Sequence, residues 1–329
     1  MFTCRQVLPN QKPAGFLHKI KKLKIAAMFT IIQRKRLTTD IVLIEVFAPR
    51  IAAGILPGQY VSVLPSEKTS SVFLPVTGTN IENGSISLLV HVVDHSTGQL
   101  ANNNEINILA NLKGPLGKPS ELTECNDKEL QSSGMLFVAG GIASATALAQ
   151  IKWLHQLGCN VDVILAAQTR NDFLFRDQFE KICRNVYLAT EDGSVGFHGS
   201  ATQLLGLLFE KQVDSYDLVT IFGTLKMMKS VSDLTLSYGV PATANFGLQL
   251  TDSFKNEPSA FRINVNGEIK DVATDGPEFN AHVVDFEHAI SRANISLNVT
   301  ENIAEAVSGN SKVHEIGKLY AGNVLPKQA

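Results

Sequence analysis

Cysteines, aromatic residues and long apolar runs are all scarce in this chain. Only four of its 329 residues are cysteine and no two of them form a C-x-x-C pair, so a disulfide framework, a structural zinc site and a four-cysteine iron–sulfur site are not expected from this chain alone. No apolar stretch approaches the ~20 residues of a membrane helix, and we expect no membrane span. The 44% of hydrophobic residues and the 24 glycines exclude disorder throughout and favour an α/β or mixed globular protein.

Acidic residues are absent before Asp40, a stretch that carries nine basic residues. The rest of the chain has 20 basic against 31 acidic residues, and this excess of negative charge disfavours nucleic-acid binding. Residues 1–27 place Phe16, Leu17, Ile20 and Leu23 on one helical face, as an organelle-targeting peptide does. The alternative is a basic extension that precedes a start at Met28. The first interpretation predicts a mitochondrion-related organelle, the second the cytoplasm.

Residues 28–120 are predicted to form a small antiparallel β-barrel. Short segments of alternating apolar and polar residues, bounded by glycine and proline, occur at 41–46, 59–63 and 86–93. Residues 124–133 are polar and are predicted to be a linker.

Residues 134–245 change to a rhythm of strand and helix. Strands are expected at 135–139, 161–166, 186–189, 218–222 and 241–244, and helices at 145–157, 177–184, 199–209 and 226–236. This alternation predicts a parallel sheet with helices on both faces, which is an α/β domain following the barrel. A small C-terminal module is expected at 246–293, with a hairpin that turns at Asn266-Gly267, and a flexible tail at 294–329.

Three glycine-containing segments have a binding interpretation and a plain one. Gly140-Gly141 follows an apolar strand and precedes a helix, as in a dinucleotide-phosphate turn, but any strand-to-helix turn can carry two glycines. Thr190, Asp192 and Gly193 follow the third parallel strand, where open sheets bind ligands, or else cap the next helix. Gly223 ends another strand and precedes a methionine pair that is typical of core packing.

Taken in order, the motifs of residues 28–290 resemble the ferredoxin–NADP reductase superfamily. Within it they are most similar to the small subunit of the NADH-dependent reduced ferredoxin:NADP oxidoreductase and to the electron-transfer subunit of dihydroorotate dehydrogenase. The matching segments are Ala48-Pro49, Pro57-Gly58-Gln59-Tyr60-Val61, Gly114-Pro115-Leu116-Gly117, Gly140-Gly141, Thr190-Glu191-Asp192-Gly193-Ser194, Gly223 with Met227-Met228, and Asp275-Gly276-Pro277-Glu278-Phe279 with Asp285-Phe286.

The resemblance implies an FAD-binding barrel, a nicotinamide-nucleotide domain and a [2Fe–2S] module. In the family's flavin signature an arginine precedes the segment that here reads Leu74-Pro75-Val76-Thr77, and Phe73 stands in its place. The lost cation is expected to weaken FAD binding roughly 10- to 100-fold. The resemblance makes these the candidate cofactor-binding residues, with no catalytic residue or metal ligand assigned: Pro75, Val76, Thr77, Ser96, Thr97, Gly140, Gly141, Thr190, Asp192 and Gly223.

The other two cofactor positions also depart from the family. Ala166-Ala167-Gln168 replaces the family's Gly-x-Arg, with Arg170 as a possible substitute for the arginine. The expected cysteine ligands of the cluster fall at Pro258, Phe261 and Ala273, and the fourth ligand at Ser253, so no [2Fe–2S] cluster is expected.

Two interpretations remain open on the sequence. One is an NAD(P)H-dependent electron-transfer flavoprotein subunit that passes electrons through FAD to a larger flavoprotein or iron–sulfur partner. The other is a non-catalytic scaffold or regulatory subunit, a pseudoenzyme, of such a complex. The retained C-terminal module is explained either by contact with the partner or by packing, with Phe261 and Val272 filling the vacated volume.

Overall fold

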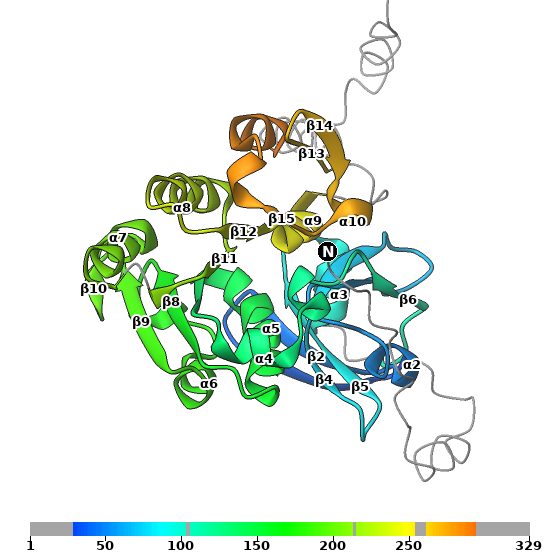
Figure 1. Ribbon diagram of the computed structural model, residues 1–329. Coiled ribbons are helices and arrows are strands. Elements are labelled where there is room, and N and C mark those ends of the chain that lie inside the picture. Colours follow the sequence, from blue (N-terminus) through cyan, green and yellow to red (C-terminus); the bar gives the residue numbers. More distant parts are fainter. Residues whose placement is uncertain (1–28, 103–105, 213–214, 254–260, 294–329) are drawn as a thin grey trace, which may run out of the picture.

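An antiparallel barrel forms the N-terminal part of the molecule (Figure 1). The computed structural model describes residues 29–102, 106–212, 215–253 and 261–293. A bridge between Thr30 and Ile108 joins the two edges of the barrel sheet. Its strands, in the order β1-β2-β5-β4-β3-β6, are β1 (Ile31–Arg36), β2 (Ile41–Phe47), β5 (Ser85–His91), β4 (Val72–Asn80), β3 (Tyr60–Leu64) and β6 (Asn111–Leu116).

The alternating pattern of the strands decides which side chains fill the barrel. In β2, Val42, Ile44 and Val46 are at most 1% exposed, whereas the residues between them are partly exposed. Successive side chains of a strand point to opposite faces, so this alternation buries one face in the barrel and leaves the other for a second layer. Helix α3 (His95–Asn102) contacts β2 and β5, and the short α2 (Pro49–Ala52) contacts β5.

A seven-stranded sheet follows, which confirms the predicted combination of a barrel and an α/β unit. Six of its strands are parallel, and the order reverses between β7 and β11. The strands, in spatial order, are β10 (Phe197–His198), β9 (Asn185–Thr190), β8 (Val161–Ala167), β7 (Met135–Gly140), β11 (Leu218–Phe222), β12 (Ala242–Asn245) and β15 (Glu278–Asn280).

Helices cover both faces of this sheet, because its central strands are apolar on both sides. In β7, Phe137 packs into the cluster beneath α5 (Ser144–Gln156) and α6 (Arg176–Ile182). The adjacent Val138 packs into the cluster beneath α7 (Ala201–Gln212) and α8 (Leu225–Ser237). Within the described ranges no helix is both long and apolar enough to cross a membrane.

The C-terminal module contains the predicted hairpin. Strands β13 (Arg262–Val265) and β14 (Glu268–Asp271) pair antiparallel, and Asn266 and Gly267 between them both have positive φ, 52° and 84°. These are the dihedrals that a two-residue type I′ turn requires. Helix α9 (Gly247–Ser253) precedes the hairpin, and α10 (Val272–Asp275) and the turn η6 (Ala281–Val283) follow it.

Two features of the fold differ from the sequence prediction. The polar segment 124–133, predicted to be a linker, contains helix α4 (Asp127–Ser132), which Asn126 caps and Leu130 anchors in the core at 3% exposure. Strand β15, from the C-terminal module, pairs antiparallel with β12 and thus extends the parallel sheet. A single buried leucine and a three-residue strand leave too little periodicity for either element to be recognised locally.

The barrel, the α/β unit and the C-terminal module share buried contacts. Tyr60 of the barrel donates a hydrogen bond to the Ala273 carbonyl (2.9 Å), and burial raises the pKa of its phenol to about 12. The Lys118 N–H bonds the Gly276 carbonyl (2.7 Å). One buried cluster contains Tyr60 and Phe73 together with Phe246. Because these contacts cross the expected boundaries, the division into domains at 120, 134, 245 and 293 stays a prediction. The predicted N-terminal extension (residues 1–27) and C-terminal tail (residues 294–329) lie outside the described ranges.

Candidate functional site

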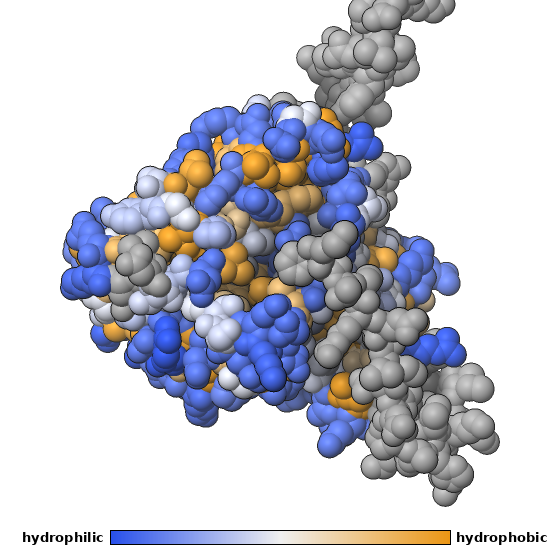
Figure 2. Space-filling view, viewed as in Figure 1, coloured by the Kyte–Doolittle hydropathy of each residue, from blue (hydrophilic) through white to orange (hydrophobic). Residues whose placement is uncertain are grey.

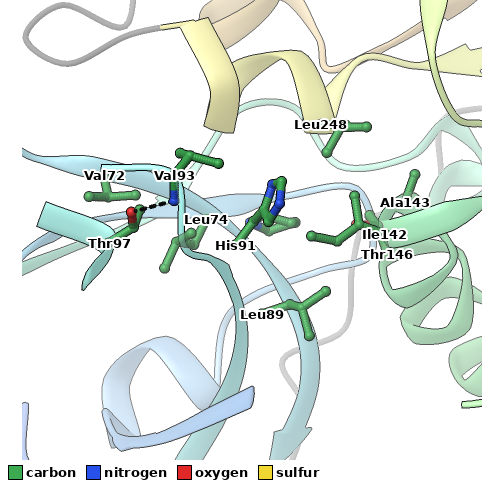
Figure 3. Close-up of a pocket in the computed structure, with 11 residues that line it drawn as sticks. Val72, Leu74, Leu89, His91, Val93, Thr97, Ile142, Ala143, Thr146 and Leu248 are labelled. Carbon is green, nitrogen blue, oxygen red and sulfur yellow. Dashed lines mark hydrogen bonds between the residues drawn. The ribbon is translucent and has the colours of Figure 1, made fainter. Parts of the chain in front are cut away.

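A cleft lies between the barrel and the α/β unit, where the resemblance implies the flavin (Figure 3). Strands β4 and β5 supply one wall, and η2 (Gly141–Ala143), α5 and α9 supply the other. The cleft encloses about 20 Å³, which is room for about one water molecule. It is lined by Val72, Leu74, Pro75, Leu89, His91, Val93, Thr97, Ile142, Ala143, Thr146 and Leu248.

The segment with the flavin signature contributes little polar surface to the cleft. Pro75 lines it, but Val76 belongs to the barrel core at 8% exposure. Thr77 is 6% exposed, and its hydroxyl donates to the Ser87 carbonyl (3.2 Å). The hydroxyl is therefore engaged with the backbone of the neighbouring strand.

Phe73 occupies buried space beside this segment. It is 4% exposed, and its ring lies edge-on to Tyr60 with a centroid distance of 6.0 Å. Among the described residues that line the cleft there is no lysine and no arginine. The phosphates of a dinucleotide would thus lack the charge-assisted partner that the family's arginine supplies.

Side chains at the start of α3 already accept hydrogen bonds from the backbone N–H groups there. Asp94 accepts hydrogen bonds from the Thr97 N–H and hydroxyl, both 2.8 Å, and Thr97 in turn accepts the Val93 N–H (3.1 Å). Ser96, beside Thr97, is 7% exposed. A carboxylate at this helix start satisfies donors that an anion would otherwise bind, and it repels a phosphate. Sequence reasoning missed Asp94, whose position two residues before Ser96 marks it as a capping residue.

His91 and Asp40 form a pair at the rim of the cleft, and the sequence analysis assigned neither to it. The His91 Nε2 lies 3.2 Å from a carboxylate oxygen of Asp40, and Figure 3 shows the imidazole pointing into the cleft. The Thr38 hydroxyl donates to the same carboxylate (2.7 Å) and, with His91, lowers the pKa of Asp40.

The glycines at the carboxyl edge of the parallel sheet lie next to one another. Gly140 ends β7, Gly223 follows β11, and these two strands are neighbours. A Cβ atom at either position would come within 2.8 Å of the Met227 sulfur, so neither tolerates a side chain without movement of Met227. Gly141 has a φ of +53°, and the space beside it is open.

Thr190 and Asp192 shape a loop on the far side of this edge. The Thr190 hydroxyl donates to the Val195 carbonyl (2.8 Å), and Asp192 accepts the Ser194 N–H (2.9 Å). Arg170 was the predicted substitute for the arginine of the family's Gly-x-Arg. Its guanidinium donates to the Ser194 carbonyl (2.7 Å), so one of its donors is already engaged. Thr190 ends β9, Asp192 lies in the loop from β9 to β10, and Arg170 follows β8 in η3 (Arg170–Asp172). None of these residues lines the cleft.

The residues at the cluster positions do not fit a [2Fe–2S] centre. Phe261 and Ala273 are buried at 2% and 3% exposure and offer no ligand atom, while Pro258 and the side chain of Ser253 lie outside the described residues. No group of three or more His, Cys, Asp or Glu side chains within the described ranges could hold a metal ion. Phe261 and Val272 are both core residues, as the packing interpretation requires.

Glu278, in β15, forms hydrogen bonds that connect the C-terminal module to the rest of the molecule. Its carboxyl group accepts a hydrogen bond from Asn245 (3.0 Å) and one from Ser120, whose oxygen also accepts from Gln150 (2.8 Å). Burial raises the pKa of Glu278 despite these two donors. A folded-state pKa above the unfolded value means that the carboxyl group favours the folded state most at low pH, and that this contribution declines as pH rises through the folded pKa.

We expect Glu278→Gln to stabilise the protein at pH 7–8 by on the order of 1 kcal/mol, because an amide can accept from Asn245 and donate to Ser120 without a charge. Urea unfolding between pH 4 and 8 measures this, and the gain should shrink toward pH 4. Glu268→Gln, an exposed carboxylate on the hairpin, is the control. A variant less stable than wild type at pH 8 would contradict a burial-raised pKa.

Comparison with known proteins identifies relatives along most of the chain. No protein-family model matches it. An uncharacterized protein in the adh 3′ region of Clostridium beijerinckii is 34% identical over 265 residues, covering 80% of this chain and 89% of the relative. A homolog of the dihydroorotate dehydrogenase B (NAD(+)) electron transfer subunit from Thermotoga maritima is 29% identical over 266 residues, covering 81% and 90%.

A solved structure agrees with these relatives. The structure of an NADH-dependent reduced ferredoxin–NADP oxidoreductase, described in connection with flavin-based electron bifurcation, superposes with a TM-score of 0.71 at 27% identity, covering 84% of this chain and 98% of the other. The chain belongs to the ferredoxin–NADP reductase superfamily. Its place in this superfamily is among chains named as electron-transfer subunits, as the motifs predicted.

Proposed function

We propose that this member of the superfamily is a non-catalytic subunit of a larger oxidoreductase complex, without FAD and without a [2Fe–2S] cluster. The observation that carries the proposal is the burial of Phe73 against Tyr60 at the position of the expected arginine. The small volume of the cleft and the Asp94 carboxylate at the start of α3 support it. No step of electron transfer is therefore derived through a flavin.

The electron-transfer flavoprotein interpretation remains the second candidate. The names of the relatives favour it, since they describe electron-transfer subunits and an NADH-dependent oxidoreductase. In that case this chain passes electrons between NAD(P)H and a partner, and the cleft must open to admit FAD.

A subunit role implies a partner, for which a larger flavoprotein or iron–sulfur subunit is the natural class. Figure 2 shows apolar surface among charged residues in the upper part of the molecule, where α8 and the C-terminal hairpin lie in Figure 1. Four large exposed apolar side chains belong to α8 and its end, to the hairpin and to η6: Leu236, Tyr238, Ile269 and Val283. We expect the chain to co-purify with such a subunit. The proposal of an organelle destination depends on residues 1–27 alone, and these residues lie outside the described ranges.

The flavin content decides between the two functions. We expect wild-type protein expressed with excess riboflavin to release no FAD on denaturation, and Phe73→Arg to bind none either, because the charge alone does not reopen the cleft. Fluorescence titration with FAD and an iron assay on the same samples provide the measurement. Phe73→Leu controls for the loss of the ring without adding charge.

Stoichiometric FAD in wild-type protein would reject the non-catalytic proposal. A tenfold or greater gain in FAD affinity for Phe73→Arg over Phe73→Leu would show that the rest of the pocket is intact, and the electron-transfer interpretation would then lead.

A further inference from the structure

The C-terminal module is attached to the rest of the molecule along strand β15. This strand lies beside β12, where the barrel, the α/β unit and the module come together (Figure 1). Two backbone hydrogen bonds reinforce the attachment. The Lys118 N–H donates to the Gly276 carbonyl (2.7 Å), and the Phe246 N–H donates to the Pro277 carbonyl (2.9 Å). Both acceptors directly precede Glu278, so the position of this one residue affects the whole attachment.

The carboxyl group of Glu278 has no cationic partner among the described residues. Its two side-chain hydrogen-bond donors are neutral. Lys118, which also contacts the module, lies 4.0 Å from Asp275 instead. Glu121, at the start of η1 (Glu121–Glu124), is the charged group that acts on Glu278, and its negative charge adds to burial in raising the pKa. Without a cation, an ionised carboxylate is unfavourable here, and the closed junction favours the neutral form.

The hydrogen-bond network around Glu278 contains one acceptor more than its donors supply. Gln150, which is 1% exposed on α5, donates from its Nε2 to the Ser120 hydroxyl oxygen (2.8 Å), and Ser120 bonds Glu278 in turn. The Oε1 of the same amide is buried and has no hydrogen-bond partner within the described ranges. A buried acceptor without a donor is unfavourable. A proton on Glu278 adds a donor to this network.

We propose that Glu278 is a proton-operated latch for the C-terminal module. With a neutral carboxyl group it holds β15 against β12 and the barrel, and its ionisation releases β15 together with the hairpin. Release separates Phe279 of β15 from Phe246, whose ring centroids are 5.8 Å apart in the closed form, and exposes aromatic surface. The latch involves this chain alone and does not depend on the proposed function.

Proton linkage determines the size of the effect. In the closed form the pKa of Glu278 is raised, whereas in the released form the carboxyl group is in water and has an ordinary pKa of about 4.3. Between these two pKa values the closed form holds one more proton than the released form. The equilibrium constant for release therefore rises about tenfold for each pH unit in this range, and it is constant above the closed-form pKa.

Hydrogen exchange of the full chain, followed by mass spectrometry from pH 5 to 9 and divided by the intrinsic exchange rate at each pH, tests the latch. Peptides that contain Lys118, Phe246 and β15 should lose protection as pH rises and then level off. Glu278→Gln should remove this dependence. Glu121→Gln should move the levelling-off to lower pH, because it removes a like charge. Glu268→Gln, an exposed carboxylate on the hairpin, should keep the wild-type profile.

Two results would overturn the proposal. One is the same pH dependence in wild type and Glu278→Gln, which would assign the effect to another group, such as His282, whose pKa is lowered by burial. The other is an equal loss of protection in peptides from β7 and β8, which would indicate unfolding of the whole chain instead of release of the module. If Glu278→Gln does not fold, Glu121→Gln still decides, since an unshifted profile in that variant rejects the latch.

Discussion

Replacing Phe246 with alanine is expected to lower the free energy of unfolding by about 3–5 kcal/mol. Phe246 is fully buried. The centroid of its ring lies 5.8 Å from that of Phe279, 6.0 Å from that of Phe286 and 6.4 Å from that of Phe261. Removal of the ring leaves a cavity at the centre of this aromatic cluster, which joins β12, β13, β15 and the segment that follows. Urea unfolding followed by circular dichroism measures the loss.

Ile269→Ala, in the same module but 57% exposed, is the control and should cost less than about 1 kcal/mol. Equal effects of the two substitutions would contradict the aromatic cluster as the anchor of the module. A large loss at Phe246 alone would favour packing as the reason why the C-terminal module is retained. Phe261, which stands at an expected cysteine position, packs in this same aromatic cluster.

Asp162→Ala is expected to lower the free energy of unfolding by about 3 kcal/mol at pH 7, which is the second large effect. Asp162 is 1% exposed near the start of β8 and accepts two hydrogen bonds from Arg184, both 2.9 Å, one from Tyr216 (2.9 Å) and one from Asn185 (3.1 Å). Burial alone would raise the pKa of Asp162, but the bonds from Arg184, Tyr216 and Asn185 outweigh it and lower the pKa. The substitution removes the buried carboxylate that accepts from the Tyr216 hydroxyl and from Arg184.

The lowered pKa determines how this loss depends on pH. The stabilisation by Asp162 is complete above the unfolded pKa of about 4 and is lost as pH falls through the lower, folded-state value. The difference between wild type and Asp162→Ala should therefore be constant from pH 5 to 7 and shrink at lower pH. Asp233→Ala, which removes an exposed partner of Lys229, should cost less than about 1 kcal/mol at any pH. A difference that grows toward acid pH would contradict the assignment.

Most of the fold was predictable because its elements depend on local periodicity. The alternation in β2 identifies Val42, Ile44 and Val46 as one face, and the structure buries that face in the barrel. The strand–helix alternation of residues 134–245 likewise predicted a parallel sheet covered on both faces. The Asn266-Gly267 turn was recognisable because few residue pairs other than glycine and asparagine adopt two positive φ angles in succession.

The candidate site was only partly predictable. The sequence showed that Phe73 replaces a cation, but only packing shows that the ring is buried against Tyr60. Pro75 and Thr97 do line the cleft, whereas Val76 and Thr77 turn toward the barrel and its strand backbone. His91 and Leu248, which face the same cleft, are far apart in the chain and follow no motif.

The sequence by itself determined the class of fold, the order of its elements and the absence of cysteine at the cluster positions, since each of these depends on residue type and local spacing. Only the tertiary structure decided which side chains meet at the candidate cofactor positions. The Tyr60–Ala273 hydrogen bond, the joining of β15 to β12 and the placement of Gln249 beside Gly223 connect residues that are 213, about 35 and 26 positions apart. Local periodicity specifies which face of an element is apolar, but the volume left between two faces depends on every side chain that packs there.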